Sequence, residues 1–308
     1  MAPLCRRREG GGRRARCEAP PACGPRTPSG RTNGPLHPCK RQTEKRGRAM
    51  GRFDGRTYLI TGGGKGIGAA VADEVAAGGG TVAVFDIDGD AATEKVAQIL
   101  AAGGRALALQ GDARDDTAVR SAVAAVVRKY GQINGLAAIA GVLRLAPIAE
   151  VPDSQWRDVV ETNVLGPFQF VRAVVPHLRA AGSGSIVLAG SAMAFASNPE
   201  AALYSASKGA IVAMTNSLAV ELATENIRVN CFAPGTVRTP MARELAQMQG
   251  APDNIDAVVD SFGQGHPMRR IIEAEEVARV VAFLLSDEAS AVTGSCYGVD
   301  AGMLANLA

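Results

Sequence analysis

The sequence predicts an α/β fold, a doubly wound parallel sheet of about seven strands with helices on both faces. From residue 55 onward, short runs rich in aliphatic residues alternate with alanine-rich segments of helical length. Such alternation is typical of βαβ units, which build parallel sheets. The expected strands are apolar throughout, as occurs where helices cover both faces of a sheet.

The expected elements follow one another closely up to residue 234. Six strands are expected at "RTYLIT", "TVAVFD", "RALALQ", "NGLAAIA", "SGSIVLAG" and "IRVNCFA". Helices are expected from about Gly66, Asp90 and Asp115, between Pro152 and Ala180, and through Tyr204 to Ala223. After Pro234 the pattern becomes irregular, as in an active-site lid, until a final helix "EAEEVARVVAFLLS" and strand "SCYGVD". Because no second alternation follows, we expect residues 51–308 to form a single domain.

Residues 1–50 differ from the rest in composition and charge. They hold thirteen Lys/Arg and three Asp/Glu, a net charge of +10, so the remaining residues carry −7 of the total of +3. This stretch is poor in large aliphatic residues and cannot bury enough surface to offset the entropy of ordering. We expect a disordered basic leader, or upstream DNA translated by mistake, with Met50 as the natural start. Because no aromatic residue lies among the arginines to stack on bases, we do not expect nucleic-acid binding.

We expect neither a secretory signal nor a membrane span. The leader lacks a long apolar run, and the most apolar run of the chain, "GLAAIAGVL", ends at Arg144. A cytoplasmic protein is therefore expected. Four cysteines fall in the leader without metal-ligand spacing, and we expect Cys231 and Cys296 to be buried, reduced thiols. The three histidines are not spaced as ligands either, so no metal site is expected.

A glycine-rich stretch, "TGGGKGIG" from Thr61 to Gly68, joins the first expected strand to the first expected helix. Glycines here allow a tight turn and a close approach of the backbone to a pyrophosphate at the helix N-terminus. A tight turn alone would also use glycine, but the position between strand and helix favours dinucleotide binding. A triphosphate loop would need Ser or Thr after the Gly-Lys pair, which this stretch does not offer.

Asp86, at the end of the second expected strand, lies about twenty residues beyond these glycines. A carboxylate in that place accepts hydrogen bonds from the adenosine ribose and repels a 2′-phosphate, which favours NAD over NADP. Lys65 argues mildly for NADP, but the carboxylate should dominate a solvated ammonium. Asp112, after the third strand, is a candidate adenine contact, and a place near a helix N-cap is its alternative.

With these elements in order, residues 52–308 resemble the short-chain dehydrogenase/reductase family. The matching features are "TGGGKGIG", Asp86, Asn163 in "NVLG", Ser191, "YSASK" and "PGTVRTP". The resemblance implies a single-domain Rossmann fold and four catalytic residues, Asn163, Ser191, Tyr204 and Lys208. Tyr204 is then the general acid/base, and we expect the ammonium of Lys208 to lower the pKa of the phenol. Ser191 would hold the substrate oxygen, and Asn163 would anchor a water that relays a proton from Lys208.

The resemblance also implies which residues bind the cofactor, NAD. They are Gly62, Gly64, Lys65, Gly66, Ile67, Gly68, Asp86, Asp112, Ala113, Ala140, Gly141, Tyr204, Lys208, Pro234, Gly235, Val237 and Thr239. The family usually carries Asn-Asn-Ala-Gly after the fourth strand, whereas this chain reads "AIAG" from Ala138 to Gly141. We expect this departure to weaken side-chain tethering of neighbouring strands and to leave the chemistry intact.

We therefore expect an NAD(H)-dependent oxidoreductase that acts on a secondary alcohol or ketone. An apolar or cyclic substrate is suggested by Met193, Phe195, Met241, Leu245 and Met248, which could instead only pack the lid. One alternative is an NADPH-dependent 3-oxoacyl thioester (acyl-carrier-protein) reductase, against which Asp86 argues. Another is a non-catalytic nucleotide-sensing regulator on the same fold. The resemblance further implies a homo-oligomer, a tetramer.

Overall fold

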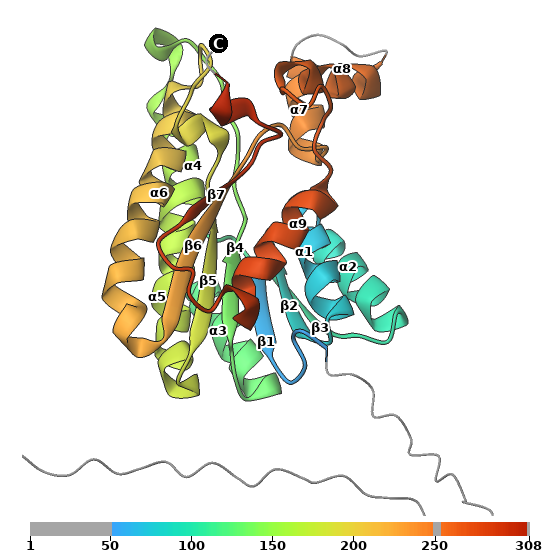
Figure 1. The fold of residues 1–308 in the computed structure, drawn as a ribbon, viewed down its shortest axis with the longest axis vertical. Helices are drawn as coiled ribbons and strands as arrows, with labels where there is room; N and C mark the ends of the chain where they lie inside the picture. Colours follow the sequence, from blue (N-terminus) through green and yellow to red (C-terminus); the bar gives the residue numbers. More distant parts are fainter. Residues whose placement is uncertain (1–50, 249–253, 307–308) are drawn as a thin grey trace, which may run out of the picture. The chain divides into compact units, whose positions relative to one another are not determined.

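In the computed structural model, a seven-stranded parallel sheet runs through the described residues, 51–248 and 254–306 (Figure 1). The strand order is β3-β2-β1-β4-β5-β6-β7. The strands are β1 (Thr57–Thr61), β2 (Thr81–Asp86), β3 (Arg105–Gln110), β4 (Gly135–Ala138), β5 (Gly184–Ala189), β6 (Ile227–Pro234) and β7 (Cys296–Val299). The predicted sheet is confirmed, while the predicted leader over residues 1–50 lies outside the described residues.

Strand order reverses at β1, which pairs with β2 on one side and with β4 on the other. The chain therefore builds the sheet outward in one direction up to β3 and then crosses over to β4. In parallel sheets, ligands bind beyond the carboxyl ends of the strands at such a reversal. Thr61 and Ala138, which end β1 and β4, lie side by side in register at this point.

Helices cover both faces of the sheet (Figure 1). They are α1 (Gly66–Ala77), α2 (Gly89–Ala101), α3 (Asp116–Tyr130), α4 (Asp153–Val160), α5 (Gly166–Ala181), α6 (Ala202–Leu222), α7 (Pro240–Met248), α8 (Ile255–Ser261) and α9 (Ala274–Leu285). None of the helices in the described ranges is both long enough and apolar enough to cross a bilayer.

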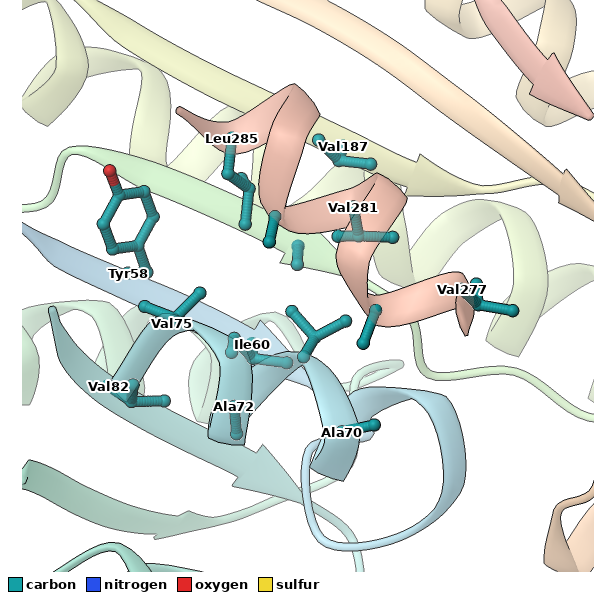
Figure 2. Close-up of a cluster of buried hydrophobic side chains, with 14 of the residues drawn as sticks. Tyr58, Ile60, Ala70, Ala72, Val75, Val82, Val187, Val277, Val281 and Leu285 are labelled. Atoms are coloured by element: carbon teal, nitrogen blue, oxygen red, sulfur yellow. The ribbon is translucent and has the colours of Figure 1, made fainter. Parts of the chain in front are cut away.

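Alternate residues of each strand pack into two separate cores. Tyr58 and Ile60 of β1 face helices α1, α2 and α9, whereas Leu59 faces α3, α5 and α6. Figure 2 shows the first core, to which α1 contributes Val75 and α9 contributes Val281. The period of two along a strand explains how a continuously apolar run can serve both faces.

The long helix expected between Pro152 and Ala180 is interrupted in its middle. It consists of α4, a π-helical stretch at Glu161–Leu165 and α5. One π turn widens the backbone locally and is common at functional sites. The buried Asn163 lies within this stretch.

The excursion after Pro234 is more ordered than expected. It contains α7 and α8, which stand apart from the sheet beyond the end of α9 (Figure 1). These two helices share a small core of their own, formed by Ala242, Ala246, Val259 and Ile271. An ion pair between Arg243 of α7 and Asp256 of α8 joins them. We call residues 240–262 the lid.

Both cysteines expected in strands lie where β6 and β7 pair. Cys231 and Cys296 are directly opposite each other in the register, and both are free thiols. Cys231 is buried as predicted, but Cys296 is only half-buried because β7 is the edge strand.

Candidate active site

The glycine-rich loop connects β1 to α1 and is closely packed against its surroundings. Gly62 and Gly66 have positive φ angles of 63° and 54°, which L-residues with side chains rarely adopt. A Cβ atom added to Gly68 would lie 2.0 Å from the carbonyl oxygen of Gly62. The loop therefore needs glycine at these positions, and its backbone is free to approach a phosphate group.

Asp86 lies beside this loop at the end of β2. Its Oδ2 accepts a hydrogen bond from the backbone N–H of Gly64 at 2.9 Å, and its Oδ1 accepts one from the N–H of Asp88 at 3.0 Å. A Cβ atom on Gly64 would come within 3.0 Å of the same Oδ2. The carboxylate is thus held at the edge of the loop, where the adenosine ribose of a dinucleotide would lie.

Lys65 forms an ion pair with Asp88, with Nζ and Oδ2 2.7 Å apart. The hydrogen bond raises the pKa of Lys65 and lowers the pKa of Asp88. Asp88 also caps α2 by accepting from the N–H of Ala91 at 3.0 Å. The lysine that argued mildly for NADP is therefore already paired with a carboxylate.

Asp112 follows β3 and is bound by a neighbouring arginine. Nη2 of Arg114 lies 2.6 Å from Oδ2 of Asp112, and this hydrogen bond lowers the pKa of the carboxyl group. Asp115, not Asp112, caps the next helix, α3. Ala113 between them is buried, and its carbonyl oxygen accepts from Nε2 of Gln169 at 3.3 Å.

The turn after β4 is attached to β1 through a hydroxyl group. Oγ1 of Thr61 accepts hydrogen bonds from the N–H of Ile139 at 3.0 Å and of Ala140 at 3.1 Å. We expected the missing amides at Ala138 and Ile139 to loosen this turn, but Thr61 supplies a tether here. Sequence reasoning missed this role, although Thr61 begins the glycine-rich stretch.

Asn163 connects three elements beside the candidate catalytic residues. Its side-chain amide exchanges two hydrogen bonds with the backbone of Val142, at 2.8 and 2.9 Å, and donates a third to Oγ of Ser207 at 3.1 Å. A Cβ atom on Gly141 would lie 3.1 Å from Oδ1 of Asn163 and 3.5 Å from Nζ of Lys208. Glycine at 141 therefore keeps the turn close to both side chains. Ser207 was not predicted as part of the site.

Ser191, just after β5, lies close to Tyr204 in the first turn of α6. Both are buried. Oγ of Ser191 accepts from the N–H of Met193 at 3.1 Å, which fixes the serine at the start of a short 3-10 turn. Burial raises the pKa of Tyr204 to about 12, and hydrogen bonding to Ser191 opposes the shift. The phenol is thus a protonated group in a dry site.

Lys208 lies one helical turn after Tyr204 and is also buried. Its Nζ donates to the carbonyl oxygen of Ala189 at 2.8 Å and lies 5.6 Å from the centroid of the Tyr204 ring. Burial lowers the pKa of Lys208 to about 8. The expected lowering of the phenol pKa by Lys208 is not seen: burial raises this pKa, and the hydrogen bond to Ser191 is what opposes the rise.

The segment after β6 passes next to the glycine-rich loop. A Cβ atom on Gly66 would lie 3.2 Å from Cγ2 of Thr239, so the threonine packs directly on the loop. Val237 forms an isolated parallel bridge with Ile272, and its carbonyl oxygen accepts from Oγ1 of Thr239 at 3.2 Å. The predicted cofactor segment, Pro234–Thr239, is therefore placed where it faces the loop.

A buried histidine at this segment, His266, was not predicted as part of the site. His266 is fully buried and accepts a hydrogen bond from the N–H of Thr236. An isolated histidine in an irregular stretch gives no sequence signal for such a role.

The five apolar residues expected to line a pocket do not line one pocket together. Met248 and Phe195 are 62% and 55% exposed, and the core of the lid is formed by other side chains. Phe195 instead lines an open pocket of about 370 Å³ together with Met303 and Leu304 near the carboxyl end of the chain. In the ranges 51–248 and 254–306, no group of three or more His, Cys, Asp or Glu residues is arranged to hold a metal ion.

Comparison with known proteins matches nearly all of the described sequence. A family model described as "Enoyl-(Acyl carrier protein) reductase" matches residues 62–304. Oxidoreductase UcpA of Salmonella typhimurium is 37% identical over 255 residues, which cover 82% of this chain and 96% of UcpA. Cyclopentanol dehydrogenase of a Comamonas species is 35% identical over 257 residues, covering 83% of this chain and 100% of that protein.

A solved structure is similar over the same region. The crystal structure of levodione reductase superimposes with a TM-score of 0.79 at 33% sequence identity. The match covers 82% of this chain and 99% of the other. The sheet and helices described above are therefore shared with a reductase of known structure.

Proposed function

The chain belongs to the short-chain dehydrogenase/reductase family of oxidoreductases, and from this premise we propose that it transfers hydride between NAD(H) and a secondary alcohol or ketone. One observation carries the proposal. Ser191, Tyr204 and Lys208 are buried close to Asn163, and the same fold carries a glycine-rich loop between β1 and α1.

The residues present fit a nicotinamide dinucleotide. A Cβ atom at Gly64 or Gly68 would collide with Ala91 or with Gly62, so the loop is bare backbone where a pyrophosphate would approach, and Gly141 lies close to Lys208. The loop amides at the N-terminus of α1 would bind the pyrophosphate. When bound, the nicotinamide ring accepts hydride during oxidation and donates it during reduction.

Proton transfer falls to Tyr204. In oxidation the phenolate of Tyr204 takes the hydroxyl proton of the alcohol while hydride leaves the carbon that bears this hydroxyl group. In reduction the phenol returns the proton to the carbonyl oxygen. Ser191 would hold the substrate oxygen beside the phenol. Lys208 supplies a positive charge near the ring, which stabilises the phenolate that forms during turnover.

The preference for NAD is proposed from Asp86. Its carboxylate lies at the loop, hydrogen-bonded to the backbone N–H of Gly64 and Asp88. A 2′-phosphate there would face a negative charge at short range. Lys65, the nearby cation, is paired with Asp88 and is not free to offset that repulsion.

An apolar or cyclic substrate is proposed from two observations. Phe195, Met303 and Leu304 line an open pocket, and Phe195 is four residues after Ser191 in the sequence. The relative from Comamonas is named for cyclopentanol, a cyclic secondary alcohol. An acyl thioester attached to a carrier protein is the competing substrate, which the description of the family model favours.

The experiment is a substrate panel with the full chain and both cofactors. NAD⁺ and NADP⁺ are offered with aliphatic, cyclic, steroid and sugar alcohols, and NADH and NADPH with a 3-oxoacyl thioester. Tyr204→Phe is measured beside the wild type, with Tyr130→Phe as control because that phenol binds the carbonyl oxygen of Ala106 at the base of the sheet. We expect NADH formation from cyclic alcohols that falls by about 10²-fold or more in Tyr204→Phe only.

The other outcomes separate the alternatives. Faster turnover of the thioester with NADPH would overturn both the NAD preference and the alcohol substrate. Tight NADH binding without turnover of any compound, equally in wild type and Tyr204→Phe, would favour a nucleotide-sensing regulator.

We also propose that the protein assembles into a homotetramer. Trp156 and Phe168, on α4 and α5, are 50% and 42% exposed, and contact with another subunit would cover them. Sedimentation velocity tests this, since a monomer at micromolar concentration would contradict it.

A further inference from the structure

His266 is a fully buried imidazole outside the residues to which the reaction has been assigned. Its Nε2 accepts a hydrogen bond from the N–H of Thr236 at 3.1 Å, and its Nδ1 lies 2.7 Å from the carbonyl oxygen of Arg270. A backbone N–H can only donate and a carbonyl oxygen can only accept. The ring is therefore neutral and carries its proton on Nδ1, with both nitrogens satisfied.

The two partners of this ring stand at opposite ends of the excursion that contains the lid. Thr236 follows β6, and Arg270 comes shortly before α9. Backbone hydrogen bonds continue the junction, from Ile272 N–H to the Thr236 oxygen at 3.2 Å and from Arg238 N–H to the Ile272 oxygen at 2.9 Å. His266 thus links the chain before the lid to the chain after it.

Close approach of the ring depends on a glycine. A Cβ atom at Gly235 would lie 2.8 Å from Nε2 of His266, closer than real contacts allow. The imidazole therefore occupies the space that a side chain at 235 would need. This fit fixes the backbone of Gly235 and Thr236 against the ring.

The position of this backbone matters for the cofactor site. Val237 and Thr239 follow directly, and Thr239 packs against Gly66 of the glycine-rich loop. A shift at Thr236 would move Thr239 relative to the loop. We propose that His266 is a positioning residue, which holds segment 234–239 in place beside the glycine-rich loop where the cofactor would bind. The proposal rests on the proposed function for the identity of that ligand.

The charged groups that adjoin the ring are engaged elsewhere. Arg269 donates to the carbonyl oxygen of Gln264, Arg270 pairs with Glu276, and Asp300 accepts from the N–H of Gly302 and Leu304. Among the described residues, no acidic side chain is bonded to His266, so two backbone groups hold the ring in place.

The test compares His266→Leu and His266→Gln in the full chain, with His177→Gln on α5 as control. Leu removes both hydrogen bonds, whereas the amide of Gln can offer an acceptor near the place of Nε2. We measure the Kd of NADH by fluorescence, and hydrogen exchange of segment 234–239 relative to β1. We expect the Leu variant to bind NADH about tenfold more weakly, the scale of one lost buried hydrogen bond, and to exchange faster in 234–239. The Gln variant should recover most of the affinity.

Unchanged exchange and Kd in the Leu variant would overturn the proposal. If the Leu variant does not fold, the Gln variant decides: a change in the exchange of 234–239 without a change in the Kd, or the reverse, would overturn it. Altered exchange in a protein that binds no nicotinamide nucleotide would support the role of His266 at the lid and remove the proposed function alone.

Discussion

The ammonium of Lys208 lies over the aromatic ring of Tyr204, 5.6 Å from its centroid, and donates its hydrogen bond to the backbone carbonyl of Ala189. Both side chains are buried, and burial shifts their pKa values in opposite directions, to about 8 for the lysine and about 12 for the tyrosine. Each shift favours the neutral form. Burying the charged lysine therefore lowers the free energy of unfolding, and replacing Lys208 should reveal by how much.

Lys208→Met should stabilise the protein at neutral pH while abolishing activity. The folded-state pKa of about 8 is below the unfolded value of 10.5, so burying the ammonium costs up to roughly 3 kcal/mol below pH 8. Between pH 8 and 10.5 the unfolded chain binds more protons, and wild-type stability should rise by about 2 kcal/mol up to pH 9.5. Urea unfolding at pH 7 and 9.5 measures this. A Met variant with the wild-type pH dependence would contradict the assignment.

The rates of oxidation and reduction should depend on pH in opposite ways. Oxidation requires the phenolate of Tyr204, which is scarce at pH 7 because burial raises the pKa of the phenol to about 12. Reduction requires the protonated phenol. We expect kcat for oxidation to rise between pH 7 and 10, by up to about tenfold per unit, while kcat for reduction does not rise. Flat profiles in both directions would show that proton transfer to Tyr204 does not limit turnover.

Asp86→Asn should weaken the discrimination against NADP⁺. The amide oxygen can still accept from one of the two N–H groups, that of Gly64 or that of Asp88, but the negative charge facing a 2′-phosphate is gone. The ratio of kcat/KM for NAD⁺ to that for NADP⁺ should fall roughly tenfold or more. Asp90→Asn, in the first turn of the neighbouring helix α2, is the matched control. An unchanged ratio in the Asp86 variant would place the cofactor preference elsewhere.

Two glycine substitutions should have opposite effects on stability. Gly68→Ala places a Cβ atom 2.0 Å from the Gly62 oxygen, so the loop must distort, at a cost of about 3 kcal/mol or more. Gly209→Ala, inside α6, meets nothing within 4 Å and should stabilise by roughly 1 kcal/mol through helix propensity. Thermal unfolding of both variants tests this. A destabilised Gly209 variant would indicate that a surface of α6 is covered by another subunit.

The sheet could be predicted because its strands are apolar and regularly spaced. All seven strands appear where expected, since burial on both faces leaves a strong sequence signal. The lid helices α7 and α8 were missed because they are short, nine and seven residues, and a small core and the Arg243–Asp256 ion pair stabilise them. The π-helical stretch around Asn163 follows from tertiary contacts that periodicity does not record.

The candidate site was predictable in its residues more than in its contacts. Ser191 lies just after a strand, and Tyr204 and Lys208 lie one turn apart in a helix, so their places can be read from nearby residues in the sequence. The partners Thr61, Ser207 and His266 depend on long-range packing, such as the 78 residues between Thr61 and Ile139. The pKa of Tyr204 is raised where the sequence predicted a lowering, because the spacing of Tyr204 and Lys208 does not indicate how deeply they are buried.

The separate small core of the lid has a consequence for how this enzyme could diversify. Ala242, Ala246, Val259 and Ile271 pack on one another and share no residue with the two cores of the sheet. Mutations in α7 and α8 can therefore accumulate without eroding the framework that carries Tyr204 and Lys208. Selection can act on these two helices as a unit, while the framework of the sheet is inherited unchanged.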